Sequence, residues 1–350
     1  MQDCECRGSS ACSVTHKLRE YPSSAVQVGM DEEGIGRSFL ILGGTGNVGK
    51  HVVLALSQCT EVSAKVYVGT RQPEMFRSQH CSPTGSQVTV EPVQCDLSCP
   101  KSVASTVASV AANSVLLCLP QSLAPKEMET VSNAVVDAAK KAGAKRLVRV
   151  ASLGIGGGDG QGALGAAHVA CEAHCHAAGL PLSSIRPTSF HTNFLTYDAE
   201  SLRKEDCFRS PLGREAKVNW VHCQDIGRVA AVLLQREETP GRGDEVFEVT
   251  GPPEATLSAP EMACLLSEEL GRPIQYEEVT PPPLPEYAQL WAFLRAGGFD
   301  CSTGVASFNF KATQILCTFS TGTVWELTGK PPTDFRSIVR ENKTMLGCKL

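Results

Sequence analysis

The chain has 350 residues, of which 42% are hydrophobic and 20% charged, a composition typical of a globular protein of about two domains. Its formal net charge is -5 and its pI about 5.9, and it has no long block of Lys or Arg, which excludes nucleic-acid binding as a main function. No apolar run approaches the roughly 18 residues of a membrane span, and the N-terminus lacks the pattern of a signal peptide. We therefore expect a cytoplasmic protein that acts on a small molecule, with no membrane or nucleic-acid partner. The sequence carries no signal for its oligomeric state.

The 16 cysteines are scattered from Cys4 to Cys348, in a chain too large to need disulfide bonds, so free buried thiols are expected. Paired C-x-x-C motifs are absent, and the cysteines and histidines between Cys171 and His176 spread around one predicted helix. Neither they nor the terminal group Cys4, Cys6 and Cys12 has the spacing of a zinc site, and no metal is predicted.

Residues 1–36 show no sustained periodicity and are predicted to be a disordered extension. From Ser38, short apolar runs alternate with helix-length segments, which is typical of βαβ units in a doubly wound parallel sheet, here a Rossmann domain over 37–187. Gly143 and Gly179 are placed to end two of the helices in a left-handed conformation. The predicted strands are 39–42, 65–69, 88–90, 114–119, 146–151 and 182–186, and the predicted helices are 47–56, 101–110, 125–142 and 163–178.

After Pro187 the alternation loosens, which predicts a smaller mixed α/β substrate-binding region over 188–345, with some of its elements returning to the Rossmann domain. It contains a helix opening at Asp225, a strand at 246–250, and a helix capped by Ser258 that ends before Gly271. Residues 281–285 are a proline-rich loop, and 297–322 receive no assignment.

A glycine turn follows the first strand and opens the first helix. A turn in this context places backbone N–H groups and the positive end of a helix dipole where a pyrophosphate can bind. The first glycine permits the tight turn, the second lets the backbone approach the phosphates, and the third allows the helix to pack on the strand. The predicted phosphate-binding residues are Gly43, Gly44, Thr45, Gly46, Asn47, Val48 and Gly49.

The end of the second strand favours NADP(H) over NAD(H). An acidic residue there would bind the ribose 2'-hydroxyl, but the chain carries Arg71, which suits a 2'-phosphate. A solvated surface arginine is the alternative. Asp96 and Leu97, after the third strand, are expected near the adenine, although Asp96 could equally cap the next helix.

Several strings in the sequence resemble the NmrA-like family of atypical short-chain dehydrogenases. They are GGTGNVGKHVV, KRLVRVASLGI, SIRPTSFHTNF, VNWVHCQDIGRVAAVLL and VWELTGKPPTDFRSIVREN, and the likeness spans roughly 38–342. The resemblance implies a Rossmann domain with a small C-terminal substrate domain. It also implies either an NAD(P)H-dependent reductase of quinones, imines or enones or a redox sensor that binds the dinucleotide without turnover. The C-terminal half looks particularly similar to reductases of ergot-alkaloid intermediates.

Standard short-chain dehydrogenases exchange a proton through a Tyr-x-x-x-Lys pair, and none of the five tyrosines here is followed by lysine at that spacing. The corresponding helix instead carries His168 and, four residues later, Glu172, whose carboxylate could orient or charge the imidazole. His168 is the candidate proton donor, with a structural pair as the alternative. Ser152 corresponds to the substrate-polarising serine that the resemblance implies, with a loop cap as the alternative.

Other residues are expected to line the pocket, because ligands bind at the carboxyl ends of parallel strands. Leu119 and Pro120 would approach the nicotinamide ribose, and the loop 154–165 is either a lid or a plain connector. Phe190 could cover the nicotinamide or belong to the core. His222 and Asp225 resemble a family motif, with Asp225 most simply a helix N-cap. The predicted substrate pocket comprises Gln121, Phe190, His191 and Asn193.

The leading hypothesis is an NADPH-dependent reductase of a small conjugated carbonyl, quinone or imine, since hydride transfer needs little beyond a positioned cofactor and an apolar pocket. A non-catalytic NADP(H) sensor is the alternative, prompted by the missing Tyr-x-x-x-Lys pair. A sugar epimerase is disfavoured, because its oxidation step depends on the absent tyrosine.

Overall fold

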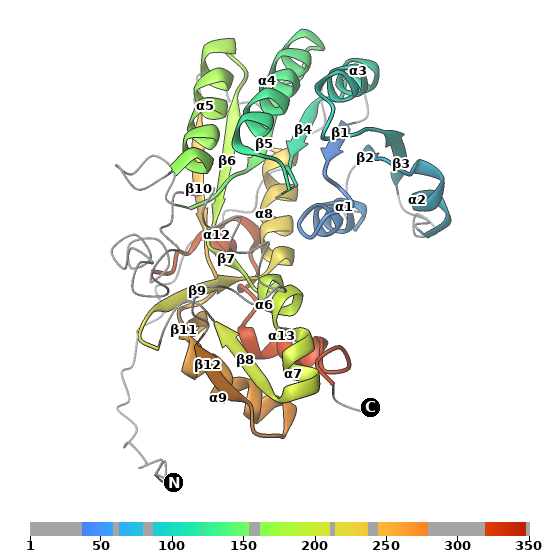
Figure 1. Ribbon diagram of the computed structural model, residues 1–350. Coiled ribbons are helices and arrows are strands. Elements are labelled where there is room, and N and C mark those ends of the chain that lie inside the picture. The colour runs from blue at the N-terminus through green and yellow to red at the C-terminus, as the bar shows by residue number, and fades with distance from the viewer. Residues whose placement is uncertain are drawn as a thin grey trace.

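A parallel seven-stranded sheet forms the centre of the fold (Figure 1). The structure is a computed structural model that describes residues 37–58, 63–79, 87–120, 122–153, 162–210, 214–236, 244–278 and 319–347. The strand order is β10-β6-β5-β4-β1-β2-β3, so the chain winds outward in both directions from the boundary between β1 and β4. The strands are β1 (Arg37–Leu42), β2 (Ala64–Thr70), β3 (Val88–Gln94), β4 (Ser114–Leu117), β5 (Arg146–Val150), β6 (Leu182–Pro187) and β10 (Glu245–Val249).

Helices cover both faces of this sheet, which explains why its strands are apolar on both sides. In β1, Phe39 and Ile41 belong to one core and Leu40 and Leu42 to the other. The first core packs under α1 (Gly49–Ser57), α8 (Cys223–Gln235) and α12 (Thr323–Thr328). The second packs under α3 (Pro100–Val110), α4 (Pro125–Lys141) and α5 (Gly162–Ala178). A further helix, α2 (Pro73–Gln79), follows β2.

The doubly wound architecture predicted from the alternation of apolar runs is confirmed. The six predicted strands of the first half all form and start close to the predicted residues. Gly143 and Gly179 have φ of +79° and +64°, the left-handed conformation expected of them. The strand predicted at 246–250 is β10, which pairs in parallel with β6 and so extends the first sheet from beyond Pro187.

A smaller mixed α/β part, which includes α7, α9 and α13, lies beside the Rossmann sheet (Figure 1). It surrounds a third core that includes Leu202, Trp220 and Leu266. Ser258 and Glu261 form a capping box on α9, and Gly271 ends that helix at φ +67°, as the sequence predicts. The strands form two small sheets, β11-β9-β7 and β12-β8. The elements are β7 (Ser189–Phe190), α6 (Thr192–Tyr197), α7 (Ala199–Glu205), β8 (Cys207–Ser210), β9 (Lys217–Val221), η1 (Pro253–Ala255), β11 (Thr256–Ser258), α9 (Ala259–Leu270), β12 (Gln275–Glu278) and α13 (Phe335–Glu341).

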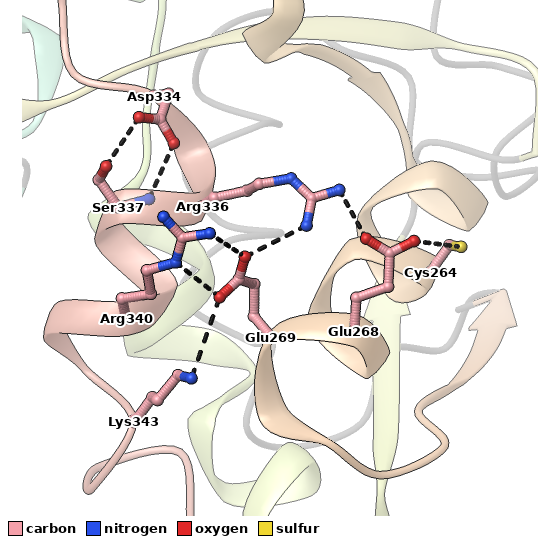
Figure 2. A network of polar contacts seen from close by, with 8 residues as sticks. All are labelled: Cys264, Glu268, Glu269, Asp334, Arg336, Ser337, Arg340 and Lys343. Carbon is pink, nitrogen blue, oxygen red and sulfur yellow. Dashed lines mark hydrogen bonds and ion pairs between the residues drawn. The ribbon is translucent and has the colours of Figure 1, made fainter.

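Charged side chains hold α13 against α9 (Figure 2). Glu269, with its side chain 8% exposed, accepts hydrogen bonds from Arg340 at 2.7 and 2.8 Å and from Arg336 at 3.2 Å. Arg336 also binds Glu268 at 2.6 Å. Hydrogen bonding from Arg340 lowers the pKa of Glu269, so its carboxylate stays charged. This network anchors the last helix to the smaller part of the fold.

Asp225 does not cap α8, contrary to expectation. The helix begins two residues earlier, and the side chain of its N-cap His222 accepts a hydrogen bond from the backbone N of Gln224 at 3.2 Å. Asp225 is fully buried and accepts hydrogen bonds from Thr333 N at 2.7 Å and Thr333 Oγ1 at 3.0 Å, as well as from Arg228. Its carboxylate therefore ties the segment between α12 and α13 to α8.

Within the described ranges, no helix is long and apolar enough to cross a membrane. The cysteines of these ranges are free thiols, and most of them are buried, as expected. The same ranges contain no group of three His, Cys, Asp or Glu residues arranged to hold a metal. Cys4, Cys6 and Cys12, the loop 281–285 and most of 297–322 lie outside the described residues.

Candidate functional site

The glycine turn lies between β1 and α1, at the point where the strand order reverses, the usual ligand site of such sheets. Gly43 has φ +88°, and a Cβ there would be 2.1 Å from the carbonyl oxygen of Cys118. A Cβ at Gly49 would be 2.0 Å from the oxygen of Gly43, and one at Gly44 would be 2.7 Å from Val68 Cγ1. All three positions therefore require glycine, which lets the turn pack against the end of β4 and the helix against the turn.

The tip of the turn is open. Thr45, Gly46 and Asn47 are exposed, and a Cβ at Gly46 would meet only the oxygen of Gly43, at 3.3 Å. Val48 is the N-cap of α1 and is 2% exposed, so it contributes its backbone while its side chain packs in the core. An exposed turn at the positive end of a helix dipole fits the pyrophosphate of a dinucleotide.

Arg71 directly follows β2 and is exposed at the same edge of the sheet. Cys95 N donates to Thr70 O at 2.9 Å, which holds the ends of β2 and β3 together. The carboxylate of Asp96 accepts hydrogen bonds from Ser98 N at 2.9 Å and Ser98 Oγ at 2.7 Å, and these bonds, with a smaller contribution from Arg71, lower its pKa. The N-cap of α3 is Cys99, so Asp96 shapes the turn before the helix and does not cap it. Leu97 packs against the second core.

The carboxyl ends of β4, β5 and β6 follow one another along the same edge of the sheet as the glycine turn, with β4 next to β1. Leu119, which packs on the second core, and the exposed Pro120 follow β4. Ser152 follows β5 and is half-buried, and among the described residues its hydroxyl makes only a long 3.4 Å hydrogen bond to Leu153 O. Gln121 and most of the loop 154–165 lie outside the described residues.

The segment after β6 divides between the core and the edge of the sheet. Phe190 packs against the first core, and Asn193 in α6 is half-buried. His191, expected in the pocket, is fully buried and stacks on Phe335 with ring centroids 5.4 Å apart. Burial and the nearby His222 lower its pKa to about 3, and neither ring nitrogen has a partner among the residues that the structure describes. The His191 ring thus points into the interior rather than into an open pocket.

His168 contacts Arg149 instead of Glu172. Its Nδ1 is 2.6 Å from Arg149 Nη2, and both side chains are buried. Glu172 instead contacts strand β6, where it accepts hydrogen bonds from Ser184 Oγ and Arg186 Nη2, each at 2.6 Å. Burial, Arg149 and Arg186 lower the pKa of His168 to about 3, so the imidazole is neutral at physiological pH.

Arg149 was missed at the sequence level, and so was the grouping of His51, His191 and His222, although His191 and His222 were each singled out. Arg149 alternates with Val148 and Val150 in an apolar strand, and a charge at such an alternating position is the signal that could have found it. The rings of His51 and His222 are 5.7 Å apart, and that of His191 is 5.8 Å from His222. These three histidines come from distant segments, so no local spacing could have linked them.

Comparisons with known proteins point to one family. The sequence model of the NmrA-like family matches residues 37–289. An NAD(P)H azoreductase of Xenophilus azovorans is 31% identical over 242 residues, which are 69% of this chain and 77% of that protein. The prestalk A differentiation protein A of Dictyostelium discoideum is 26% identical over 309 residues, which are 87% of this chain and 92% of that protein.

A solved structure shares the fold of this chain. The triphenylmethane reductase of Citrobacter sp., complexed with NADP(H), has a TM-score of 0.64 at 18% identity, over 87% of this chain and 99% of that one.

Proposed function

Because this chain belongs to the NmrA-like family, we propose that it is an NADPH-dependent reductase of a small conjugated carbonyl, quinone or imine. Two similar proteins support the reaction class: one is named an NAD(P)H azoreductase, and the other is a triphenylmethane reductase complexed with NADP(H). Both names describe the reduction of conjugated, nitrogen-containing or aromatic molecules. That chemistry matches the hydride acceptors proposed here.

The observation that carries the proposal is the open glycine turn at the reversal point of the sheet. The glycines whose Cβ atoms would collide with Cys118 O and Gly43 O bring the turn close to β4, while Gly46 stays exposed at the start of α1. These features fit a pyrophosphate bound by backbone N–H groups. When bound, NADPH supplies the hydride.

The residues around this turn supply binding and orientation. Arg71 is proposed to bind the 2'-phosphate, with Asp96 and Leu97 beside the adenine and Leu119 and Pro120 beside the nicotinamide ribose. Ser152 and His168 are proposed to donate hydrogen bonds to the substrate heteroatom that gains negative charge during the transfer. The proposed pocket includes Gln121, Phe190 and Asn193, whereas the burial of His191 supports a structural role.

A glycine variant tests the cofactor site. In Gly46→Ala the added methyl group fits the turn apart from its 3.3 Å approach to Gly43 O, but it separates the backbone from the phosphates. We expect NADPH binding to weaken at least about tenfold, measured by fluorescence titration, with little loss of stability. Gly143→Ala is the matched control: it strains a residue at φ +79° remote from the turn, so it should lower stability and leave the NADPH affinity unchanged. Equal affinities of Gly46→Ala and wild type would contradict the assignment.

Turnover is measured as NADPH oxidation with a panel of quinones, enones, cyclic imines and azo compounds. Reduction of any of these substrates by wild type, but not by Gly46→Ala at the same NADPH concentration, would support the reductase. Tight NADPH binding without reduction of any of them would refute it.

A non-catalytic NADP(H) sensor is the second candidate. It is favoured by the lack of a Tyr-x-x-x-Lys pair and by the relative named for differentiation, which has no enzymatic activity in its name. Binding of NADPH without turnover is its expected outcome in the same experiment.

A further inference from the structure

Arg149 is a buried arginine that lies where the second core adjoins the carboxyl ends of the strands. Arg149 is 1% exposed, and its side chain lies on the face of β5 that α5 covers, because Leu147, two residues earlier, belongs to the second core. His168 is in the second turn of α5, close to the helix end that adjoins the carboxyl ends of the strands. The Nη2 to Nδ1 distance of 2.6 Å joins the two residues at that end.

The chemistry of arginine fixes the direction of this hydrogen bond. A guanidinium group has only donors and stays protonated, so Nδ1 of His168 must be the acceptor and cannot carry a proton. A neutral imidazole has one ring proton, which must then be on Nε2. The direction therefore follows from the identity of the partner and does not depend on placing hydrogens.

The surrounding charges keep the imidazole neutral. From β5 it faces Arg149 and from β6 Arg186, while Glu172 on its own helix has both carboxylate oxygens bound, one to Ser184 and one to Arg186. Among the residues that the structure describes, no carboxylate is thus left to stabilise an imidazolium at this point. One turn further along α5, a hydrogen bond with Cys175 lowers the pKa of the Cys171 thiol, and the charge of Arg149 adds a smaller contribution.

We propose that Arg149 is a positioning residue of the reductase, which holds His168 as the neutral Nε2–H form so that His168 serves as a hydrogen-bond donor and not as an acid. This inference rests on the proposed function. The hydride adds to the electrophilic atom of the substrate, His168 Nε2–H stabilises the negative charge that develops on its heteroatom, and water supplies the proton that neutralises it. A neutral imidazole is a competent electrophile of this kind, and the donor stays available in mildly acidic solution.

The test compares Arg149→Met and Arg149→Lys with wild type, using 15N-labelled full-length protein. Two-bond 1H–15N correlation spectra identify the tautomer of His168, assigned with His168→Gln, at a series of pH values from about 5 to 8. Wild type and Arg149→Lys should show the Nε2–H form without titration. Arg149→Met should show mixed tautomers and a higher pKa, because it lacks the cation that opposes protonation.

Kinetics separate a donor from an acid. His168→Gln keeps a neutral N–H donor and should retain kcat within about tenfold, whereas His168→Leu should lose about 100-fold, with KM less affected in both. If His168 were a proton-donating acid, the two variants would be equally impaired. His174→Gln, which replaces a half-buried histidine of the same helix that binds Asp137, is the matched control and should behave as wild type.

The stability of the Arg149→Met variant shows whether a loss of kcat is caused by unfolding. Nε and Nη1 of Arg149 have no partner among the described residues, so replacing this buried cation with an apolar side chain should leave the urea midpoint unchanged or raise it while kcat falls. Wild type with a proton on Nδ1, or with a titration near pH 6, would overturn the positioning role. If wild type shows the Nε2–H form and binds NADPH but reduces none of the tested substrates, the reductase and the donor role fail, while the tautomer assignment stands.

Discussion

The exposed guanidinium of Arg71 at the end of β2 offers a single-residue test of cofactor choice. Arg71→Ala should weaken NADPH binding by about 10- to 100-fold, because a charge-assisted hydrogen bond to a phosphate is lost, and should change NADH binding little. Titration with the two cofactors measures the ratio. Arg77→Ala, which removes an exposed arginine paired with Glu74 on α2, is the control. Equal losses for NADPH and NADH would mean that Arg71 is a solvated surface residue.

For single side chains, the sequence predicted the place of a residue in the fold better than the residues that it contacts. Gly43, Arg71 and Ser152 lie at the strand ends, and Gly49 at the start of α1, where the βαβ pattern put them. The contact expected between His168 and Glu172 fails because Ser184 and Arg186, brought by the adjacent strand, bind the carboxylate. The spacing along one helix correctly placed the pair but carried no information about the strand beneath it.

Among the elements, α8 shows how the C-terminal segment is attached. Asp225 on this helix accepts hydrogen bonds from Thr333, and Arg228 also donates to Pro331 O at 3.0 Å. Asp225→Ala should lower the free energy of unfolding by roughly 3 kcal/mol, since it removes a buried carboxylate and leaves its partners unsatisfied. Urea denaturation measures the change. Asp137→Ala, at an exposed carboxylate that binds His174, should cost less than about 1 kcal/mol. Similar losses in both variants would contradict the anchoring role.

The elements that were missed are the short ones. β7, β8 and β12 have two to four residues each, and their pairing partners lie far along the chain, so no periodicity could develop within them. The start of α8 was misplaced because histidine is an unusual N-cap residue whereas aspartate is a common one. Long amphipathic helices and apolar parallel strands carry their pattern locally, and these were found.

The whole molecule should lose stability in mild acid because several of its histidines are buried in the neutral form. His51 and His191 have pKa values lowered to about 4 and about 3, mainly by burial, from an ordinary value of about 6.5. Between about pH 4 and pH 6.5 the unfolded chain binds more protons than the folded one. The free energy of unfolding is therefore highest above about pH 6.5 and falls as the pH drops toward 4. Urea denaturation across this range measures the loss.

His191→Met isolates one contribution to this pH dependence. His191 faces His222 and Asp334 and stacks on Phe335, where an apolar side chain can pack. At pH 5 the variant should lose roughly 2 kcal/mol less than wild type relative to neutral pH, because one buried group no longer resists protonation. His176→Gln, with an exposed side chain, is the control and should follow wild type. An unchanged slope in His191→Met would show that the buried ring does not titrate on unfolding.

The parallel pairing of β10 with β6 has a consequence for how the chain folds during synthesis. β6 ends at Pro187 and pairs with β5 on one side, but β10, its neighbour on the other side, is not complete until residue 249. Until then β6 is an edge strand with unpaired backbone groups, which are prone to pair with another chain. Nascent chains that stall on the ribosome between these points should therefore need a chaperone more than the completed protein does.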